Sequence, residues 1–503
     1  MRDRRGFLFA WAPWSIFVLA VAWPTAALIG KSVLSGESPE SGFVYTSREL
    51  GLLSRSLGLA CAATLASIVF SLPTAFTVAR LRSATRSPLL AAVLMATLMC
   101  PPMVYAFGWE HILPAGVDPY VRCVGVWALW AWPIPALLIG AGWARAGRSA
   151  FEAALLDCTP FEAFTRAAFP VLIRYAALAG LVLFVLFFTD YGVPHACGIG
   201  LKVIATELLS LAAGSVRSID TLWPSIPSIV VTAAALTAAF SVWRKCPAED
   251  PPHLGRRATE KIPAWLIAVT FGCFAVSWVV PIATLALRVG TDTGILAEAV
   301  TVYGADLAWS LCVAAVAGTA VTVMGVALAA ARWFRVMGLV WTVALGAVPG
   351  ALVGKALVLA YSHRYFSFVF DHWPIVALSY VSRFAWIGLA MGILTIDSRR
   401  SEIIAQAATD GAGRCTILAR ILLPRLWPAW TCGAGIVAAL SVAEVAASTL
   451  VRVPGASPVA HILIEKFHRF EDGMLVSLSL WLVTASLLAA GLMLGALRML
   501  RRE

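Results

Sequence analysis

Residues 54–79 read SRSLGLACAATLASIVFSLPTAFTVA, a long run in which most side chains are apolar. A helix needs about 20 mostly apolar residues to cross the hydrocarbon core of a bilayer, so this run predicts a membrane span. The pair Ser56-Leu57 within it recurs as Ser310-Leu311 in a second apolar run. The fold is therefore expected to consist of membrane helices that occur in two copies.

The composition of the whole chain also indicates a membrane protein. Of the 503 residues 60% are hydrophobic and 13% are charged, whereas a soluble domain carries about 25% charged residues. Lipid cannot satisfy free backbone polar groups, so the spans are expected to be helices and the fold an all-α membrane protein. We expect twelve spans, near residues 9–30, 54–79, 88–109, 122–143, 171–194, 222–243, 263–287, 307–331, 337–361, 374–396, 426–450 and 474–497.

The duplication extends beyond one pair of residues. Pro170 and Pro424 are separated by the same 254 positions as the two Ser-Leu pairs, and so are the intramembrane acids Asp190 and Glu444. This period is too long for a solenoid, but half-chain repeats are common in transporters. With six spans each, the halves would have the same orientation and be parallel repeats. The expected organisation is a first half at 1–243, a polar, Pro-rich cytoplasmic linker at 244–262 and a second half at 263–503.

The distribution of Lys and Arg predicts the orientation of the chain. With twelve spans both termini lie on one side, which would hold 25 of the 38 Lys and Arg residues but 11 of the 27 Asp and Glu residues. We therefore expect both termini in the cytoplasm. The net charge of +11 is then a topology signal, and no nucleic-acid partner is expected.

Two expected cytoplasmic loops, 144–170 and 397–425, are long and occupy corresponding places in the two halves. Residues 152–170 read EAALLDCTPFEAFTRAAFP, and residues 405–424 read AQAATDGAGRCTILARILLP. Each sequence predicts a short helix, a break and a second helix that enters the membrane. An Asp can cap a helix start, Gly permits a sharp turn, and Pro is tolerated in a first helical turn. The break and the entry proline are Asp157-Cys158 with Pro170 in one loop, and Asp410-Gly411 with Pro424 in the other.

These loops resemble the "EAA" loop of ABC-importer permeases, whose signature is E-A-A-x-x-x-G-x(9)-I-x-L-P. The second loop fits this spacing from Gly411 to Pro424 and keeps Ala407, but Ala405 replaces the acid. The first loop keeps Glu152-Ala153-Ala154, has Cys158 in place of the Gly, and is one residue shorter before its proline. Each copy thus preserves what the other has lost.

Further motifs resemble the fused permeases of ferric-iron type, in which both halves lie in one chain. The run FTDYGVP, which contains Asp190 and Tyr191, is similar to their ADFGxP segment. The resembling segments of the second half are Pro349-Gly350, YVSRF at 380–384 with Arg383, and SVAEVAASTLVRVPG at 441–455 with Glu444.

The resemblance implies the permease subunit of an ATP-driven importer in a bacterial inner membrane. Two copies of an ATP-binding subunit would hold the two long loops, and an external binding protein would deliver the substrate. ATP and magnesium would be bound by the partners, so this chain would be no enzyme and hold no cofactor. Ferric iron is the favoured substrate, and thiamine or a phosphonate are alternatives. An ion-gradient-driven secondary transporter or a membrane-embedded enzyme remain rival interpretations.

Asp190 and Glu444 are the candidate residues of the translocation path or gate, together with Tyr191, Pro349, Gly350 and Arg383. An ionisable group at membrane depth costs about 2.5 kcal/mol or more, so it is expected to face protein or water. In one interpretation the two acids form an acidic ring for a cationic substrate. In the other they anchor helix ends, bonded to the backbone, to Arg383 or to Arg452.

Three other features of the sequence say less about function. Lys355 lies in an expected span and is expected to snorkel or to pair with an acid. The ten cysteines lie mostly inside expected spans without a C-x-x-C pair, and Cys197 is the clearest outward candidate. We therefore expect neither a disulfide framework nor a metal site. No nucleophile and base can be paired, so no catalytic residue is expected.

Overall fold

The computed structural model is helical throughout its described part. It describes residues 12–500 except 35, 37, 40–41, 43, 82–86, 115, 145–147, 199–200, 247–261, 291–292, 331–332, 334–335, 397–405, 408, 414–415, 417–419 and 421–422. Within these residues every element is a helix, and a bridge between Val453 and Ala456 is the one β-type pairing. The expectation of an all-α fold is confirmed.

Eight described helices are long and apolar enough to cross a bilayer, which supports a membrane-embedded protein. They cover 12–32, 47–80, 160–188, 219–244, 264–289, 294–329, 374–393 and 472–492. Two bent pairs raise the number to ten if each is one span: α6 (Pro119–Ala131) with α7 (Pro133–Gly142), bent by 48°, and α18 (Gly338–Gly346) with α19 (Gly350–Tyr361), bent by 89°.

The two remaining expected spans are interrupted. The first divides into α4 (Ser87–Met99) and α5 (Pro102–Glu110), because two consecutive prolines at 101 and 102 have no N–H to continue a helix. The second divides into α24 (Leu423–Ala443) and α25 (Ala446–Leu450) at Glu444. Twelve spans therefore stay a prediction.

The described chain forms two compact units. Unit 1 comprises 1–50, 204–233 and 294–503, and unit 2 comprises 51–203 and 234–293. Each unit thus contains the first expected span of one half together with most of the other half. The expected halves, 1–243 and 263–503, are halves of the duplicated sequence and differ from these spatial units. The units do not test that division, so it stays a prediction.

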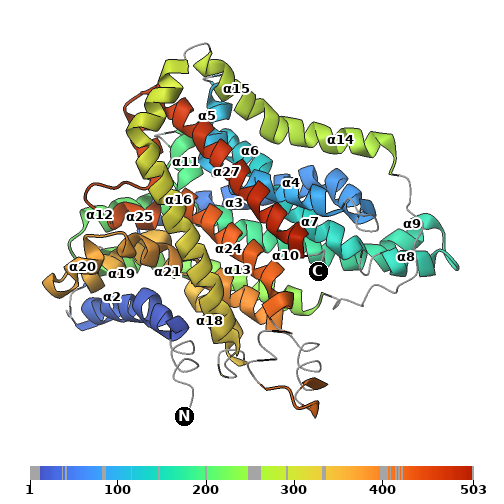
Figure 1. The fold of residues 1–503 in the computed structure, drawn as a ribbon, viewed down its shortest axis with the longest axis horizontal. Helices are drawn as coiled ribbons and strands as arrows, with labels where there is room; N and C mark the ends of the chain where they lie inside the picture. The colour runs from blue at the N-terminus through green and yellow to red at the C-terminus, as the bar shows by residue number, and fades with distance from the viewer. Residues whose placement is uncertain are drawn as a thin grey trace. The chain divides into compact units, whose positions relative to one another are not determined.

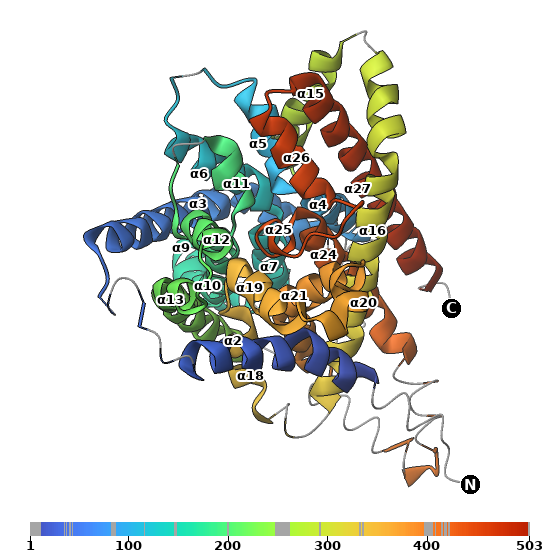
Figure 2. The same ribbon diagram turned by 90° about the vertical axis from the view of Figure 1, so that its left-hand side faces the viewer.

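Unit 1 is built around α19 and α21 (Pro374–Ile396). Helix α2 (Trp23–Leu34) packs along α19, and the π-helical turn η1 (Val18–Ala22) packs against α21; the blue helix beside the orange ones shows this in Figures 1 and 2. The other elements of unit 1 are the start of α3 (Ser47–Leu81), α12 (Ile204–Gly214), the first part of α13 (Ile219–Arg244), α16 (Thr293–Ala330), α18, η5 (Arg364–Phe366), α20 (Ser367–Phe370), α24, α25, α26 (Val459–His468) and α27 (Asp472–Leu500).

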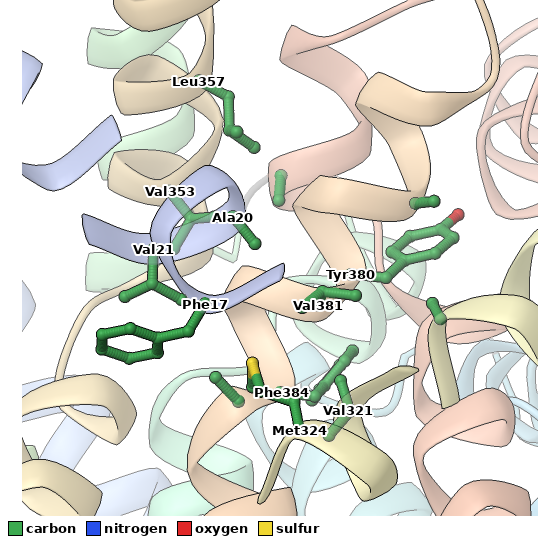
Figure 3. Close-up of a cluster of buried hydrophobic side chains, with 14 of the residues drawn as sticks. Phe17, Ala20, Val21, Val321, Met324, Val353, Leu357, Tyr380, Val381 and Phe384 are labelled. Atoms are coloured by element: carbon green, nitrogen blue, oxygen red, sulfur yellow. The ribbon is translucent and has the colours of Figure 1, made fainter. Parts of the chain in front are cut away.

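The core of unit 1 forms where the N-terminal segment meets these helices. Figure 3 shows Phe17, Ala20 and Val21 among buried side chains that come from α16, α19 and α21. The Tyr361 hydroxyl donates a hydrogen bond of 2.7 Å to the Leu19 carbonyl. This carbonyl therefore has a hydrogen-bond partner within the apolar surroundings. Glycines let α16 and α21 approach closely, because a Cβ at Gly325, Gly388 or Gly392 would collide with the facing backbone.

Unit 2 contains a helix pair that corresponds to α2 and α19 of unit 1. Helix α15 (Val280–Val289) packs against α5, where a Cβ at Gly108 would lie 2.7 Å from the Cβ of Pro281. Thr77 and Thr270 share a hydrogen bond of 2.8 Å between α3 and α14 (Ala264–Phe274). The other elements of unit 2 are α4, α6, α7, α8 (Arg148–Ala154), α9 (Pro160–Ala163), η3 (Phe164–Ala168), α10 (Phe169–Phe188), α11 (Gly192–Cys197), the end of α13 and η4 (Ala275–Val279).

Candidate functional site

The first candidate site is the break between α10 and α11, which we call the Asp190 break. The Asp190 carboxylate accepts hydrogen bonds from the backbone N–H of Gly192 at 3.0 Å and of Val193 at 3.2 Å. It also accepts one of 2.8 Å from the indole N–H of Trp127 in α6. The first N–H groups of a helix have no partner within the helix, and a carboxylate there is favourable. Asp190 therefore starts α11 and ties it to α6.

The second candidate site is the break between α24 and α25, which we call the Glu444 break. One oxygen of Glu444 accepts a hydrogen bond of 3.0 Å from the Ala447 N–H at the start of α25. The other forms an ion pair with Nε of Arg383 at 3.5 Å, and the two side chains are only 12% and 8% exposed. Arg383 also donates a hydrogen bond of 3.0 Å to the Val348 carbonyl, which lies between α18 and α19. One guanidinium thus links two breaks in unit 1.

Pro349 and Gly350 shape the bend beside this ion pair. Pro349 takes an extended conformation as the N-cap of α19 (φ −61°, ψ 149°), which separates α19 from α18. A Cβ on Gly350 would lie 2.8 Å from a Glu444 oxygen and 3.1 Å from the Ala446 Cβ. The glycine therefore makes room for the carboxylate. In unit 2, Pro101 is the extended N-cap of α5 (φ −56°, ψ 136°) in the same way.

The geometry fits the interpretation of both acids as helix-end anchors. Glu444 uses Arg383, one of the two arginines proposed for it, and Asp190 uses the backbone and an indole. Tyr191 is the N-cap residue of α11 and stacks on His195, with 4.9 Å between ring centroids. Since Asp190 and Glu444 belong to different units, an acidic ring that contains both stays a prediction.

Sequence reasoning missed one polar residue, Trp127, and the hydrogen-bond partners of another, Lys355. Trp127 was one of many tryptophans, and nothing local marks it as the donor to Asp190. Lys355 was expected to snorkel or to pair with an acid, and in the structure its ammonium group donates to the carbonyls of Ser215 at 2.5 Å and Ala212 at 3.3 Å. These carbonyls end α12, where backbone acceptors lack helical partners and a positive charge is favourable.

The first long loop has the expected order of helix, break and helix. Helix α8 ends at Ala154, a turn contains Asp157, and α9 leads through η3 into α10, whose second residue is Pro170. The expected cap at Asp157 is wrong, because α9 begins three residues later. Thr159 is the N-cap, and it exchanges hydrogen bonds with Glu162 in a capping box. The turn is exposed, and so are Glu152 and Ala153.

The second long loop is described in part. The Ala412 N–H donates a hydrogen bond of 3.0 Å to the Ala407 carbonyl, and Gly411 has φ +82°. This is the Schellman arrangement, in which a left-handed glycine ends a helix. Asp410 therefore ends the preceding helical turn and does not begin the next one, contrary to expectation. Pro424 is the second residue of α24, and position 405 lies outside the described residues.

The two loops make their turns by different means. Of the described residues other than glycine, Phe470 alone has a positive φ, so Cys158 does not reproduce the conformation of Gly411. The first loop instead closes its turn with a hydrogen bond of 2.9 Å from the Cys158 N–H to the Ala154 carbonyl. A glycine is therefore required in the second loop only.

Within the described part of the chain, no three His, Cys, Asp or Glu side chains are grouped so that they could hold a metal ion. The two breaks and the two loops are thus the places where polar chemistry is organised. Comparisons with family models, curated proteins and solved structures give no match to this chain.

Proposed function

We propose that this chain is the transmembrane permease subunit of a bacterial ATP-driven importer. The observation that carries the proposal is the pair of long loops with related sequence at corresponding places. In the first, a short helix, a turn and a second helix lead into an apolar span through a proline in its first turn. The second has a glycine-ended helical turn and a proline at the same place in α24. Such short exposed helices suit a partner that moves them.

Equivalent contacts in the two units support two parallel six-span halves. In unit 1 the first span of the first half, α2, packs on α19, and in unit 2 the first span of the second half, α15, packs on α5. Helices α5 and α19 both follow an extended proline. The Asp190 and Glu444 breaks also correspond. A duplicated chain in which each half lends its first helix to the other explains all these pairs.

The proposed mechanism assigns the chemistry to partners. Two ATP-binding subunits hold the loops around Asp157 and Asp410, and their closure on ATP and magnesium pushes the loops. The halves then rock between outward-open and inward-open states as rigid bodies. An external binding protein delivers the substrate near 196–221 and 451–473, and both termini face the cytoplasm. Ferric iron is the favoured substrate, with thiamine or a phosphonate as alternatives.

Affinity purification tests the proposal directly. The tagged full-length chain is extracted in a mild detergent, and its partners are identified and quantified by mass spectrometry. An ATPase at two copies per chain is the expected result. If the chain purifies alone and moves solute into liposomes along an ion gradient without ATP, the secondary-transporter alternative replaces this proposal.

The glycine of the second loop gives a sharper test. A non-glycine residue in the left-handed region costs about 1–2 kcal/mol, and the site of Gly411 is otherwise open, so Gly411→Val perturbs the backbone alone. We expect Gly411→Val to insert normally but to lose transport and co-purified ATPase. Gly413→Val is the matched control, because Gly413 is also open but has no positive φ. Normal uptake of iron, thiamine and aminoethylphosphonate by Gly411→Val cells would argue against the assignment of the loop.

A further inference from the structure

Two buried cysteines of unit 2 lie on the two helices α6 and α11 that meet at the Asp190 break. Cys123 is in α6 and Cys197 is the last residue of α11, and both are almost completely buried. Cys123 lies one helical turn from both Pro119 and Trp127, the two residues of α6 that contact the ends of α11, and Cys197 directly precedes Gly198, so the two thiols are neighbours. In the structure both are free thiols.

Helix α11 approaches α6 at both of its ends. At its start, Asp190 accepts the indole hydrogen bond from Trp127 of α6. At its end, a Cβ on Gly198 would lie 3.4 Å from Pro119, the first residue of α6. Both cysteines therefore lie in the part of the α6–α11 interface that these two contacts enclose.

Packing alone does not explain why both positions are cysteine. The residues 254 positions later are Ala377 and Val451, which are also buried and belong to the hydrophobic core of unit 1. The equivalent place in the other half is thus filled by ordinary apolar side chains. A small apolar pair satisfies the fold there, so the two thiols add a chemical property that the packing does not need.

We propose that Cys123 and Cys197 form a disulfide that secures α11 to α6. The two thiols exchange with the disulfide of a thiol oxidoreductase: the S–S bond between Cys123 and Cys197 forms, the S–S bond of the oxidoreductase breaks, and the two protons and two electrons pass to its sulfurs. Because both thiols are buried, the exchange takes place before α11 closes onto α6. The inference rests on the proposed orientation, which places α11 on the outer side, where disulfides persist.

The disulfide would fix the Asp190 break in the arrangement described above. In unit 1 the Glu444 break is tied to a neighbouring helix by the buried ion pair with Arg383. Unit 2 has a neutral indole donor in that role. A covalent bond at the far end of α11 then supplies the second fastening of that short helix.

Differential alkylation of the native chain tests the disulfide. Membranes are dissolved in denaturant with light N-ethylmaleimide, reduced, and labelled with deuterated N-ethylmaleimide before mass spectrometry. We expect deuterated label on most of Cys123 and Cys197, and light label on the exposed Cys61. In Cys197→Ala, Cys123 should change to light label. Light label on both residues of the native chain, or deuterated label retained on Cys123 in Cys197→Ala, would overturn the proposal.

A second variant separates this proposal from the proposed orientation. Val216 is highly exposed and lies in an expected outward loop, so Val216→Cys should react with a membrane-impermeant maleimide on intact cells. If Val216→Cys reacts and Cys123 and Cys197 carry light label, the disulfide fails and the orientation stands. If Val216→Cys is protected and the two cysteines carry light label, both fail.

Discussion

The ion pair between Arg383 and Glu444 allows a quantitative test of how the Glu444 break is held. Both side chains are nearly buried, so Arg383→Met leaves a carboxylate without its cation in a poorly hydrated place. Removing one partner of a buried pair costs about 3–5 kcal/mol, and we take about 3 kcal/mol because Glu444 keeps the Ala447 N–H. Glu444→Gln should cost about 2 kcal/mol, since Arg383 keeps the Val348 carbonyl.

The double variant Arg383→Met/Glu444→Gln leaves no buried charge at the Glu444 break. It should lose only about 1 kcal/mol, for the unsatisfied carbonyl of Val348. The two single effects would then exceed the double effect by several kcal/mol, which is the signature of a direct interaction. The native chain, the two single variants and the double variant are heated in detergent. Size-exclusion chromatography of the heated samples then gives the melting temperature of each protein.

Arg469→Met is the matched control for this cycle. Arg469 pairs with Glu465 at 2.8 Å, a shorter distance than in the buried pair, but the side chains are 62% and 42% exposed. An exposed pair contributes about 0–1 kcal/mol, so melting should hardly change. The reasoning is refuted if Arg469→Met and Arg383→Met lower the melting temperature equally, or if the double variant melts no higher than Arg383→Met.

Three further predictions concern single positions. Gly350→Ala should lower the melting temperature, because its Cβ would lie 2.8 Å from a Glu444 oxygen; an unchanged melting temperature would show that the carboxylate can move away. Lys355→Met should cost about 1–3 kcal/mol, since buried carbonyls at the end of α12 lose their donor, and hydrogen exchange in α12 should rise. Thr159→Ala removes the cap of α9 and should cost about 1 kcal/mol, seen as faster exchange in α9, whereas Thr165→Ala should not produce this change.

Apolar runs predicted where helices lie but not how far they extend. The run at 54–79 corresponds to α3, yet α3 begins at Ser47. Its polar first turn is fixed by Glu49, whose carboxylate accepts hydrogen bonds from the backbone and hydroxyl of Thr46. A hydropathy average is lowered there by Ser47, Arg48 and Glu49, and it takes no account of the hydrogen bonds by which specific side chains extend the helix.

Breaks inside apolar runs were harder to predict than the runs themselves. Residues 88–109 and 337–361 are mostly apolar, and each was expected as one continuous span. The structure interrupts them before Pro102 and Gly350, after prolines that are helix N-caps. The prolines were visible in the sequence, but a proline inside an apolar run can also be accommodated in a continuous helix, as Pro73 is in α3.

The candidate site shows the same limit at the level of single side chains. The sequence predicted Asp190, Glu444 and Arg383 because charged residues are conspicuous in apolar surroundings. It could not single out Trp127, because an indole is equally at home in packing or at a membrane interface, and its role depends on a carboxylate 63 positions away. Charge marks a candidate in the sequence, whereas a neutral donor is recognised only when the fold brings it to its acceptor.

The two candidate breaks differ in a way that bears on how the two halves would move. The Glu444 break is held by a charged pair. Separating its helices would leave two unpaired ions in a medium of low dielectric constant, which is costly. The Asp190 break is held by backbone N–H groups and one neutral indole. Its carboxylate can keep the two backbone bonds while α11 leaves α6 and the hydrogen bond from the neutral indole breaks. We therefore expect the Asp190 break to open more easily than the Glu444 break, unless a disulfide at the end of α11 holds that helix on α6.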